Sequence, residues 1–250
     1  MICYHGTPIN PISAASVILA ERHAMVSFSD TAQMPLVAEI CQSFVIDNGA
    51  FSHWGKTGQT VDAPAFASFV HEWDRHPGFD WCLIPDKIDG NEFDNDELIR
   101  EWERLYGHHN SVPVWHLHES IERLDRLSKI WPRVAFGSSG EWPNPGNDKW
   151  WDRISAAMDA ICDPSGRPRC KIHGLRMMCP TIFSHIPFSS VDSCNIAKNI
   201  GIDQRWDNHM YLRGLNKGSR AQVMAARLEA HAAASTWKGR DTQMSFDLLG

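Results

Sequence analysis

The segment Ser43–Phe51 reads S-F-V-I-D-N-G-A-F, so three apolar residues run directly into Asp47, Asn48 and Gly49. A short apolar run that ends in polar and turn-forming residues is typical of a parallel strand covered on both faces. Including this one, the sequence contains runs of the same kind at Ile2–Tyr4, Ala24–Phe28, Phe44–Ile46, Trp81–Ile84, Pro113–Leu117, Val134–Phe136, Ile172–Met177 and Phe188–Val191. These runs predict parallel strands that recur along the whole chain.

Stretches with helical spacing follow most of these runs. Apolar residues repeat at every third or fourth position after the cap-like residues Asp94, Ser120 and Asp148. The alanine-rich stretch from Ser219 to about Ala234 predicts a closing helix. The segment Gly140–Asn147 contains two prolines and two glycines, which predicts a loop.

This alternation over 250 residues, with no internal linker, predicts a single (β/α)8 TIM-type barrel. We expect the α/β barrel to occupy residues 1–238, with its C-terminal helix, and residues 239–250 to form a short tail. A doubly wound open parallel sheet is the alternative architecture.

The composition of the sequence limits the cellular environment and the binding partners that we expect for the protein. The seven cysteines are an odd number without a C-x-x-C pair, which favours reduced thiols. No apolar run is long enough for a membrane span, so we expect a soluble, cytoplasmic protein. The net charge of −6 argues against a non-specific nucleic-acid coat protein. A local basic patch remains compatible with the cations of the last third: Lys171, Arg176, Arg205, Arg213, Lys217, Arg220, Arg227, Lys238 and Arg240.

Polar residues concentrate where the predicted strands end. In a parallel barrel the functional face lies at the carboxyl ends of the strands. The residues at these ends are His5, Asp47, Asn48, Asp86, Lys87, His116, His118, Gly137, Ser138, Ser139, Gly140, Glu141, His173, Arg176, Asp192 and Ser193. So many ionisable groups at one rim predict a catalytic site.

Each of the three aspartates has a structural alternative. Asp47 either contacts substrate or exchanges a proton, or an Asx turn begins at Asp47 or Asn48. Asp192 is either a nucleophile or the N-cap of a helix that starts at Cys194. Asp86 either binds substrate, or it pairs with Lys87 or caps a loop.

Two further patterns suggest a ligand. The spacing of His116 and His118, together with His5 and His173, is compatible with a metal-dependent hydrolase, although we expect neither a metal nor another cofactor. The small residues Gly137–Gly140 would allow a planar ligand or phosphate to approach the backbone.

The order of these motifs resembles the tRNA-guanine transglycosylase superfamily, which includes DNA-guanine transglycosylases of 7-deazaguanine modification. The family's D-S-G-G-F turn is similar to Asp47–Phe51, its F-D-E turn to Ile84–Lys87, and its G-G-L-A-x-G-E stretch to Gly137–Glu141. The resemblance covers roughly residues 43–195. The family's zinc motif has no counterpart after Cys194, so a short zinc-less relative that acts on DNA fits best.

The resemblance implies a barrel that cleaves a base–sugar bond through a covalent aspartate, which would be Asp192 here. It assigns Asp47 and Asp86 to the N–H edge of the base or to proton transfer, and leaves base exchange and base excision open. The substrate-binding residues that we predict are Asp86, Asn48, Phe51, His116, Gly137, Ser138, Ser139, Gly140, His173 and Arg176.

The segment Gln243–Leu249 reads Q-M-S-F-D-L-L and is similar to the Q-x-x-L-x-L-F peptide that tethers bacterial DNA enzymes to the sliding clamp. This similarity supports DNA as the substrate and the clamp as a partner. A non-catalytic barrel that binds nucleic acid or the clamp is the remaining alternative.

Overall fold

The computed structural model describes residues 1–52, 61–200 and 214–239. Its centre is a parallel sheet with the strand order β5-β4-β3-β2-β1-β9-β8-β7-β6. The strands are β1 Ile2–Gly6, β2 His23–Ser27, β3 Ser43–Asp47, β4 Phe79–Leu83, β5 Ser111–Val112, β6 Val114–His116, β7 Arg133–Gly137, β8 Lys171–Gly174 and β9 Ser190–Ser193. Strand β1 pairs with both β2 and β9, so the strands follow one another in chain order around a ring. The predicted α/β barrel is confirmed, and the doubly wound sheet is excluded.

Pro113 divides the predicted strand Pro113–Leu117 from the residues before it and produces two short strands, β5 and β6. Proline lacks the N–H that a sheet ladder requires. Strand β5 pairs with β4, whereas β6 pairs with β7. The barrel is therefore nearly closed, and no ladder joins β4 to β6 in the described chain.

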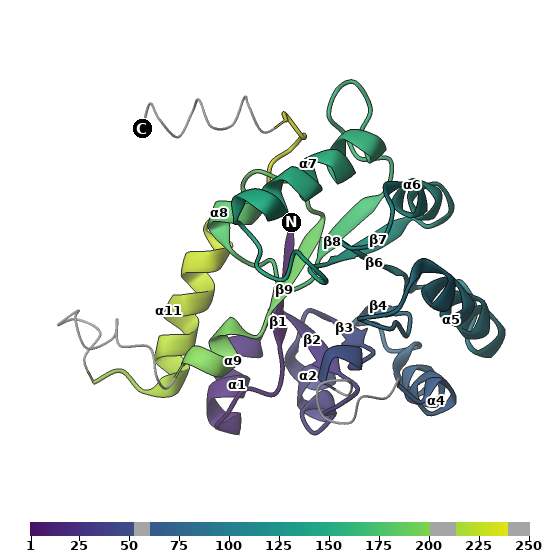
Figure 1. The fold of residues 1–250 in the computed structure, drawn as a ribbon. Coiled ribbons are helices and arrows are strands. Elements are labelled where there is room, and N and C mark those ends of the chain that lie inside the picture. The colour runs from purple at the N-terminus through teal and green to yellow at the C-terminus, as the bar shows by residue number, and fades with distance from the viewer. Residues whose placement is uncertain (53–60, 201–213, 240–250) are drawn as a thin grey trace, which may run out of the picture.

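Helices surround the ring of strands (Figure 1). They are α1 Ile12–Leu19, α2 Met34–Ile40, α4 Ala63–Trp73, α5 Glu92–Leu105, α6 Ile121–Ile130, α7 Asp148–Ile161, α8 Pro180–Phe183, α9 Asn195–Asn199 and α11 Lys217–Glu229. Ser120 caps α6 as predicted. The loop Gly140–Asn147 is also confirmed, and its last residue, Asn147, caps α7 in place of Asp148.

Two other helices start earlier than predicted. Asn91, and not Asp94, caps α5, because its side chain accepts the N–H of Asp94. Asn216 caps α11 in the same way, so this helix begins at Lys217 and ends at Glu229 instead of running from Ser219 to Ala234. The alanines beyond the helix leave its axis, and the N–H of Ala234 bonds to α8.

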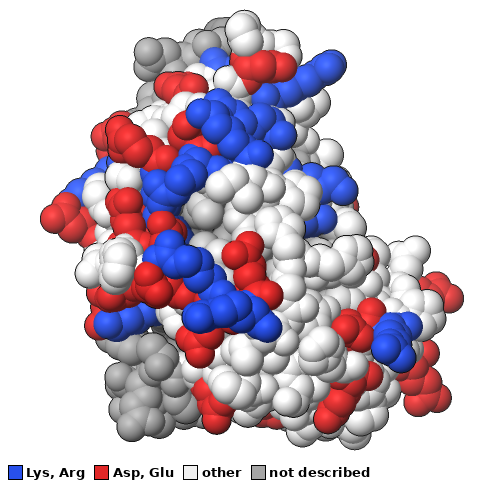
Figure 2. All heavy atoms as spheres, turned by 90° about the vertical axis from the view of Figure 1, so that its right-hand side faces the viewer, with Lys and Arg blue, Asp and Glu red and all other residues white. Residues whose placement is uncertain are grey.

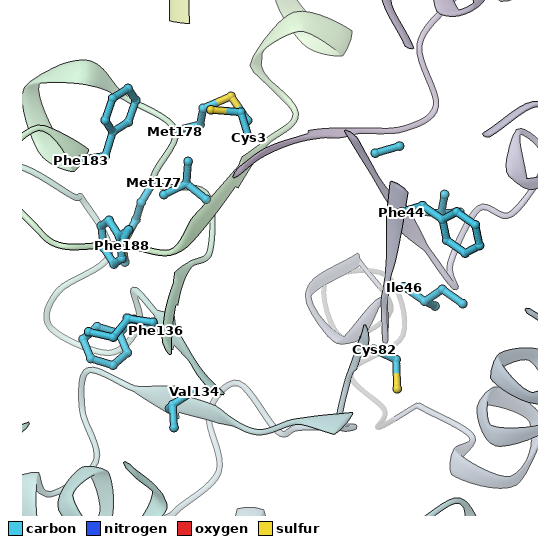
Figure 3. Packing of buried hydrophobic residues seen from close by; sticks show 14 of the residues in the cluster. Cys3, Phe44, Ile46, Cys82, Val134, Phe136, Met177, Met178, Phe183 and Phe188 are labelled. Atoms are coloured by element: carbon cyan, nitrogen blue, oxygen red, sulfur yellow. The ribbon is translucent and has the colours of Figure 1, made fainter. Parts of the chain in front are cut away.

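Side chains alternate along the strands between the barrel interior and the surrounding helices. Phe44, Ile46 and Val134 point away from the ring (Figure 3). Tyr4, Val45, Trp81 and other residues form a separate interior cluster. Asp47 is two residues beyond Val45, so the same alternation directs it into the barrel.

Strands β8 and β9 differ most from their predicted ranges. Strand β8 ends at Gly174, not Met177, because Arg176 adopts a left-handed conformation with φ +58° that strands exclude. Strand β9 starts at Ser190, two residues after Phe188, and extends to Ser193. Asp192 therefore lies inside a strand.

No helix in the described ranges is long and apolar enough to cross a membrane. All seven cysteines are free thiols. On the face that carries α4, α5 and α6, basic and acidic side chains are interleaved (Figure 2).

Candidate active site

A cavity of about 540 Å³ lies at the carboxyl ends of the strands. This is the face at which barrel enzymes carry out their chemistry. It brings together these predicted site residues: Asp47, Asn48, Phe51, Asp86, His116, Gly137, Ser138, Arg176, Asp192 and Ser193.

Asp47 ends β3 and lines the cavity wall. Burial against protein atoms raises the pKa of Asp47 to about 7, and the carboxylates of Asp192 and Asp86 add to this shift. The hydroxyl of Ser27 and the amide of Gly49 offset part of it. A carboxyl group with a pKa near neutrality can both give and take a proton under physiological conditions.

The neighbouring Asn48 forms the Asx turn that was the structural alternative at this position. Its Oδ1 accepts the N–H of Ala50 at 2.7 Å, and Gly49 adopts φ +76° in the bend. Because Asn48 makes this turn, Asp47 stays directed into the cavity.

Asp86 belongs to a buried hydrogen-bonded group and does not pair with Lys87, whose ammonium contacts Asp94 instead. Oδ2 of Asp86 lies 2.7 Å from Nε2 of His116, and Oδ1 accepts the side-chain amide of Asn48 at 2.7 Å. These contacts fix the carboxylate plane and leave lone pairs for a further donor.

Asp192 lies in β9 and is 4% exposed. Its Oδ1 accepts the backbone N–H of Arg176 at 2.9 Å and lies 3.3 Å from Nε2 of His173. The alternative role as a helix N-cap is wrong, because Ser193 accepts the N–H of Asn195 at the start of α9. Asp192 thus presents a fixed carboxylate to the cavity.

Arg176 connects two sides of the cavity. A guanidinium N–H donates to the carbonyl oxygen of Ser138, and the guanidinium carbon lies 4.3 Å from the centre of the Phe51 ring. The left-handed backbone of Arg176 places both its N–H and its side chain at the site. Such a conformation in a non-glycine residue is sterically costly and often occurs at functional sites.

Several predicted rim residues lie elsewhere. His5 faces outward and bonds to Glu229 of α11 at 2.8 Å, because the strand alternation that turns Tyr4 inward turns His5 outward.

His118 lies beyond β6 and contacts Ser139 and the carbonyl oxygen of Gly90. Gly140 packs against His118, where a β-carbon would come within 2.8 Å of it. None of these four, His5, His118, Ser139 and Gly140, lines the cavity.

His173 is also not a cavity-lining residue, although we expected it to bind substrate. It is fully buried below Asp192. Lys87 and Glu141 pair with Asp94 and Lys149 respectively, outside the cavity.

The histidines do not converge as a metal-dependent hydrolase requires. His5 lies on the outer side of the barrel, whereas His116 and His173 lie on the inner side. Within the described ranges, no three His, Cys, Asp or Glu side chains come close enough to hold a metal ion.

Lys171 and Arg176 do not belong to one basic patch. Lys171 and Arg176 lie at opposite ends of β8. Arg205, Arg213, Arg240 and the clamp-like segment Gln243–Leu249 lie outside the described residues.

Several residues that line the cavity were not predicted from the sequence. Asn195, Lys198 and Asn199 line it from α9, and Ser27 and Asp30 line it from the end of β2. Ser27 is the last residue of β2, so the expectation that site residues lie at strand ends could have included it. The short helix α9 has no sequence signal of its own, but it directly follows Asp192.

No protein-family model matches the sequence, and no curated protein matches it significantly. Solved structures show a likeness in fold. A mutant tryptophan synthase alpha-subunit from Pyrococcus furiosus has a TM-score of 0.52 and 11% identity, covering 92% of this chain and 97% of that one. A second mutant of that subunit has a TM-score of 0.52 at 12% identity over the same shares. At this identity the likeness supports the barrel and carries no information about the reaction.

Proposed function

We propose that this protein cleaves the N-glycosidic bond of a nucleobase in DNA, by base exchange of the 7-deazaguanine type or by base excision. The observation that carries the proposal is the presence of Asp47, Asp86 and Asp192 in one cavity, each in a different environment. Three carboxylates with unequal surroundings can divide nucleophilic attack, proton transfer and base recognition among them.

Asp192 is the nucleophile in this proposal. The N–H of Arg176 donates to its Oδ1, which also contacts Nε2 of His173. No described residue donates to Oδ2, so we assign the attack on the substrate to this oxygen. A carboxylate oxygen attacks C1′ of the sugar while the C1′–N bond breaks, and the electron pair of that bond stays on the base. Water or an incoming base then displaces Asp192 from C1′.

Asp47 supplies the proton that the departing base needs. A group with a pKa of about 7 is partly protonated at neutral pH and can donate to a leaving nitrogen. After base departure it can accept a proton from the water or base that enters.

Asp86 recognises the base in this proposal. Guanine-like bases present N–H donors on one edge, and a carboxylate is their natural acceptor. Asn48 and His116 hold Asp86 in one orientation, so its remaining lone pairs face a fixed direction. The cavity carboxylates also disfavour a phosphate in its interior, although Arg176 and Lys198 are among the other residues that line it.

The cavity volume of about 540 Å³ is in the range of small-molecule sites and suits a single extruded nucleotide. Phe51 is 53% exposed and lines the cavity, so its ring is available to stack on a base. The clamp-like segment Gln243–Leu249 supports DNA over RNA or a free nucleoside. We propose the sliding clamp as a partner on that basis.

The test is incubation of the protein with modified and unmodified DNA, with and without added 7-deazaguanine bases, followed by mass spectrometry of nucleosides and free bases. We expect release or incorporation of a base by the unaltered protein and a loss of at least about 1,000-fold in Asp192→Asn.

Asp125→Asn is the matched control, because Asp125 is a carboxylate on α6 that pairs with Lys129 and Arg169 at the surface. It should retain full activity. Undiminished activity in Asp192→Asn, or the absence of base turnover on every DNA supplied, would contradict the proposal.

A further inference from the structure

His173 lies directly beneath the cavity and is fully enclosed by the barrel. Its ring packs edge-on against Trp81, with 4.8 Å between the ring centres, and Tyr4 lies on another side. Nδ1 is 2.9 Å from Oγ of Ser190, and Nε2 is 3.3 Å from Oδ1 of Asp192. Protein groups therefore occupy both ring nitrogens.

The direction of these hydrogen bonds follows from the partners of Ser190. A guanidinium N–H can only donate, and NH1 of Arg133 lies 2.8 Å from Oγ of Ser190. Ser190 accepts that bond, and among the described residues the acceptor within reach of its own hydroxyl proton is Nδ1 of His173. A buried hydroxyl proton without an acceptor is costly, so it points to Nδ1. A nitrogen that accepts carries no proton, so the ring proton is on Nε2 and faces Asp192.

The two other protonation states of His173 are disfavoured. A proton on Nδ1 would place the Nε2 lone pair against the Asp192 carboxylate. A doubly protonated ring would be a buried cation near Arg133. Burial lowers the pKa of His173, and the Arg133 charge acts in the same direction, although Asp192 opposes it. The groups that face the ring are Asp192 and Ser190 on β9, Arg133 on β7, Trp81 on β4 and Tyr4 on β1.

We propose that His173 is a positioning residue for Asp192, and that the chain Arg133–Ser190 holds it in the tautomer with the proton on Nε2. The inference for turnover rests on the proposed function, whereas the tautomer can be measured without it. His173 and the N–H of Arg176 converge on the same oxygen, Oδ1, and together orient Oδ2 toward the substrate.

The first experiment is 15N NMR of the full-length protein labelled in its histidines. We expect the His173 ring at pH 7 to show an unprotonated Nδ1 and a protonated Nε2. Loss of the signal in His173→Gln assigns it, and a contact with the Trp81 ring assigns it independently if that variant does not fold. A ring protonated on Nδ1, or on both nitrogens, overturns the proposal.

The second experiment compares neighbouring serines. Ser190→Ala removes the donor to Nδ1, so the two tautomers should mix and kcat should fall on the order of 100-fold, with KM little changed. Ser190→Thr keeps a hydroxyl and should restore most of kcat. Ser189→Ala is the matched control, because Ser189 also lies near Arg133 but bonds to the carbonyl oxygen of Ile172 and does not contact His173.

The outcomes separate the two proposals. If the unaltered protein turns over no base, the proposed function fails, and the NMR tautomer still decides the assignment for His173. If the protein is active but Ser190→Ala keeps both the kcat and the His173 signals of Ser189→Ala, the positioning role is wrong. Circular dichroism confirms that each variant compared is folded.

Discussion

Oδ2 of Asp86 and Nε2 of His116 lie 2.7 Å apart and join the loop after β4 to the end of β6. No backbone ladder connects these two strands in the described chain, because β5 pairs with β4 and β6 pairs with β7. At the cavity, a side-chain contact therefore spans the interruption that Pro113 introduces into the barrel wall.

Asp86→Asn should weaken base binding more than it slows the chemical step. The substitution replaces an acceptor with a donor at one oxygen, so a base N–H meets no acceptor there. We expect KM for the DNA substrate to rise about 10- to 100-fold, with a smaller change in kcat. Lys87→Ala removes a neighbouring charge outside the cavity and should change neither constant. A pure kcat defect in Asp86→Asn would assign Asp86 to the chemistry.

The rate should depend on the protonation of Asp47. Its pKa of about 7 means that the fraction of proton donor falls as pH rises through neutrality. We expect kcat to decline above about pH 7, and Asp47→Asn to lower kcat on the order of 100-fold and abolish this limb. The measurement is kcat between pH 5 and 9. If kcat of the variant still declined above about pH 7, a group other than Asp47 would be responsible for the decline.

The raised pKa of Asp47 also predicts how the stability of the folded protein changes with pH. The pKa of Asp47 is raised in the folded protein, so the unfolded chain loses this proton first as pH increases from about 3.8. The stability contribution is present at low pH and is lost between about pH 4 and 7. Asp47→Asn should therefore match the wild type near pH 4 and exceed its free energy of unfolding by about 4 kcal/mol at pH 8. Urea unfolding at the two pH values checks this difference.

Two substitutions of Arg176 separate its backbone from its side chain. Both Arg176→Gly and Arg176→Ala remove the guanidinium contact with Phe51 but keep the N–H that binds Asp192. Only glycine accepts φ +58° without strain, so Arg176→Gly should be more stable than Arg176→Ala by about 1 kcal/mol. Equal unfolding free energies would show that the chain rearranges at this position.

The buried cation Arg123 should contribute strongly to folding. It donates to Glu119 at 2.6 Å, and both side chains are fully buried. Arg123→Met leaves Glu119 without its charge partner and should cost about 3–5 kcal/mol. Arg126→Met is the control, because Arg126 contacts the same Asp96 as Arg123 but is half exposed, and should cost less than about 1 kcal/mol.

The sequence was sufficient to predict the barrel and the end of the barrel at which the cavity lies. Continuous apolar runs such as Phe44–Ile46 predict buried parallel strands, and the carboxylates after them meet wherever such strands close. The inward direction of Asp47 and Asp192 depends on the phase of the side-chain alternation. A continuous apolar run does not reveal that phase, which is why His5 was wrongly expected at the rim.

Other differences arise from tertiary contacts. The positive φ of Arg176 ends β8 early, and nothing in the letters L-R-M-M marks it. His173 follows the strand rule but lies one layer deeper than the cavity, because Asp192 extends above it. The capping residues Asn91 and Asn216 precede the predicted starts, since a cap is decided by which side chain reaches the N–H three residues ahead.

The interruption at Pro113 gives ligand binding a mechanical consequence. Asp86 is a group that we propose to recognise the base, and its contact with His116 also links the segment after β4 to the end of β6. A base whose N–H donates to Asp86 would change the strength of the contact between Asp86 and His116. Ligand occupancy should thus change how readily the barrel wall opens there, and amide hydrogen exchange of β4 and β6 would register it.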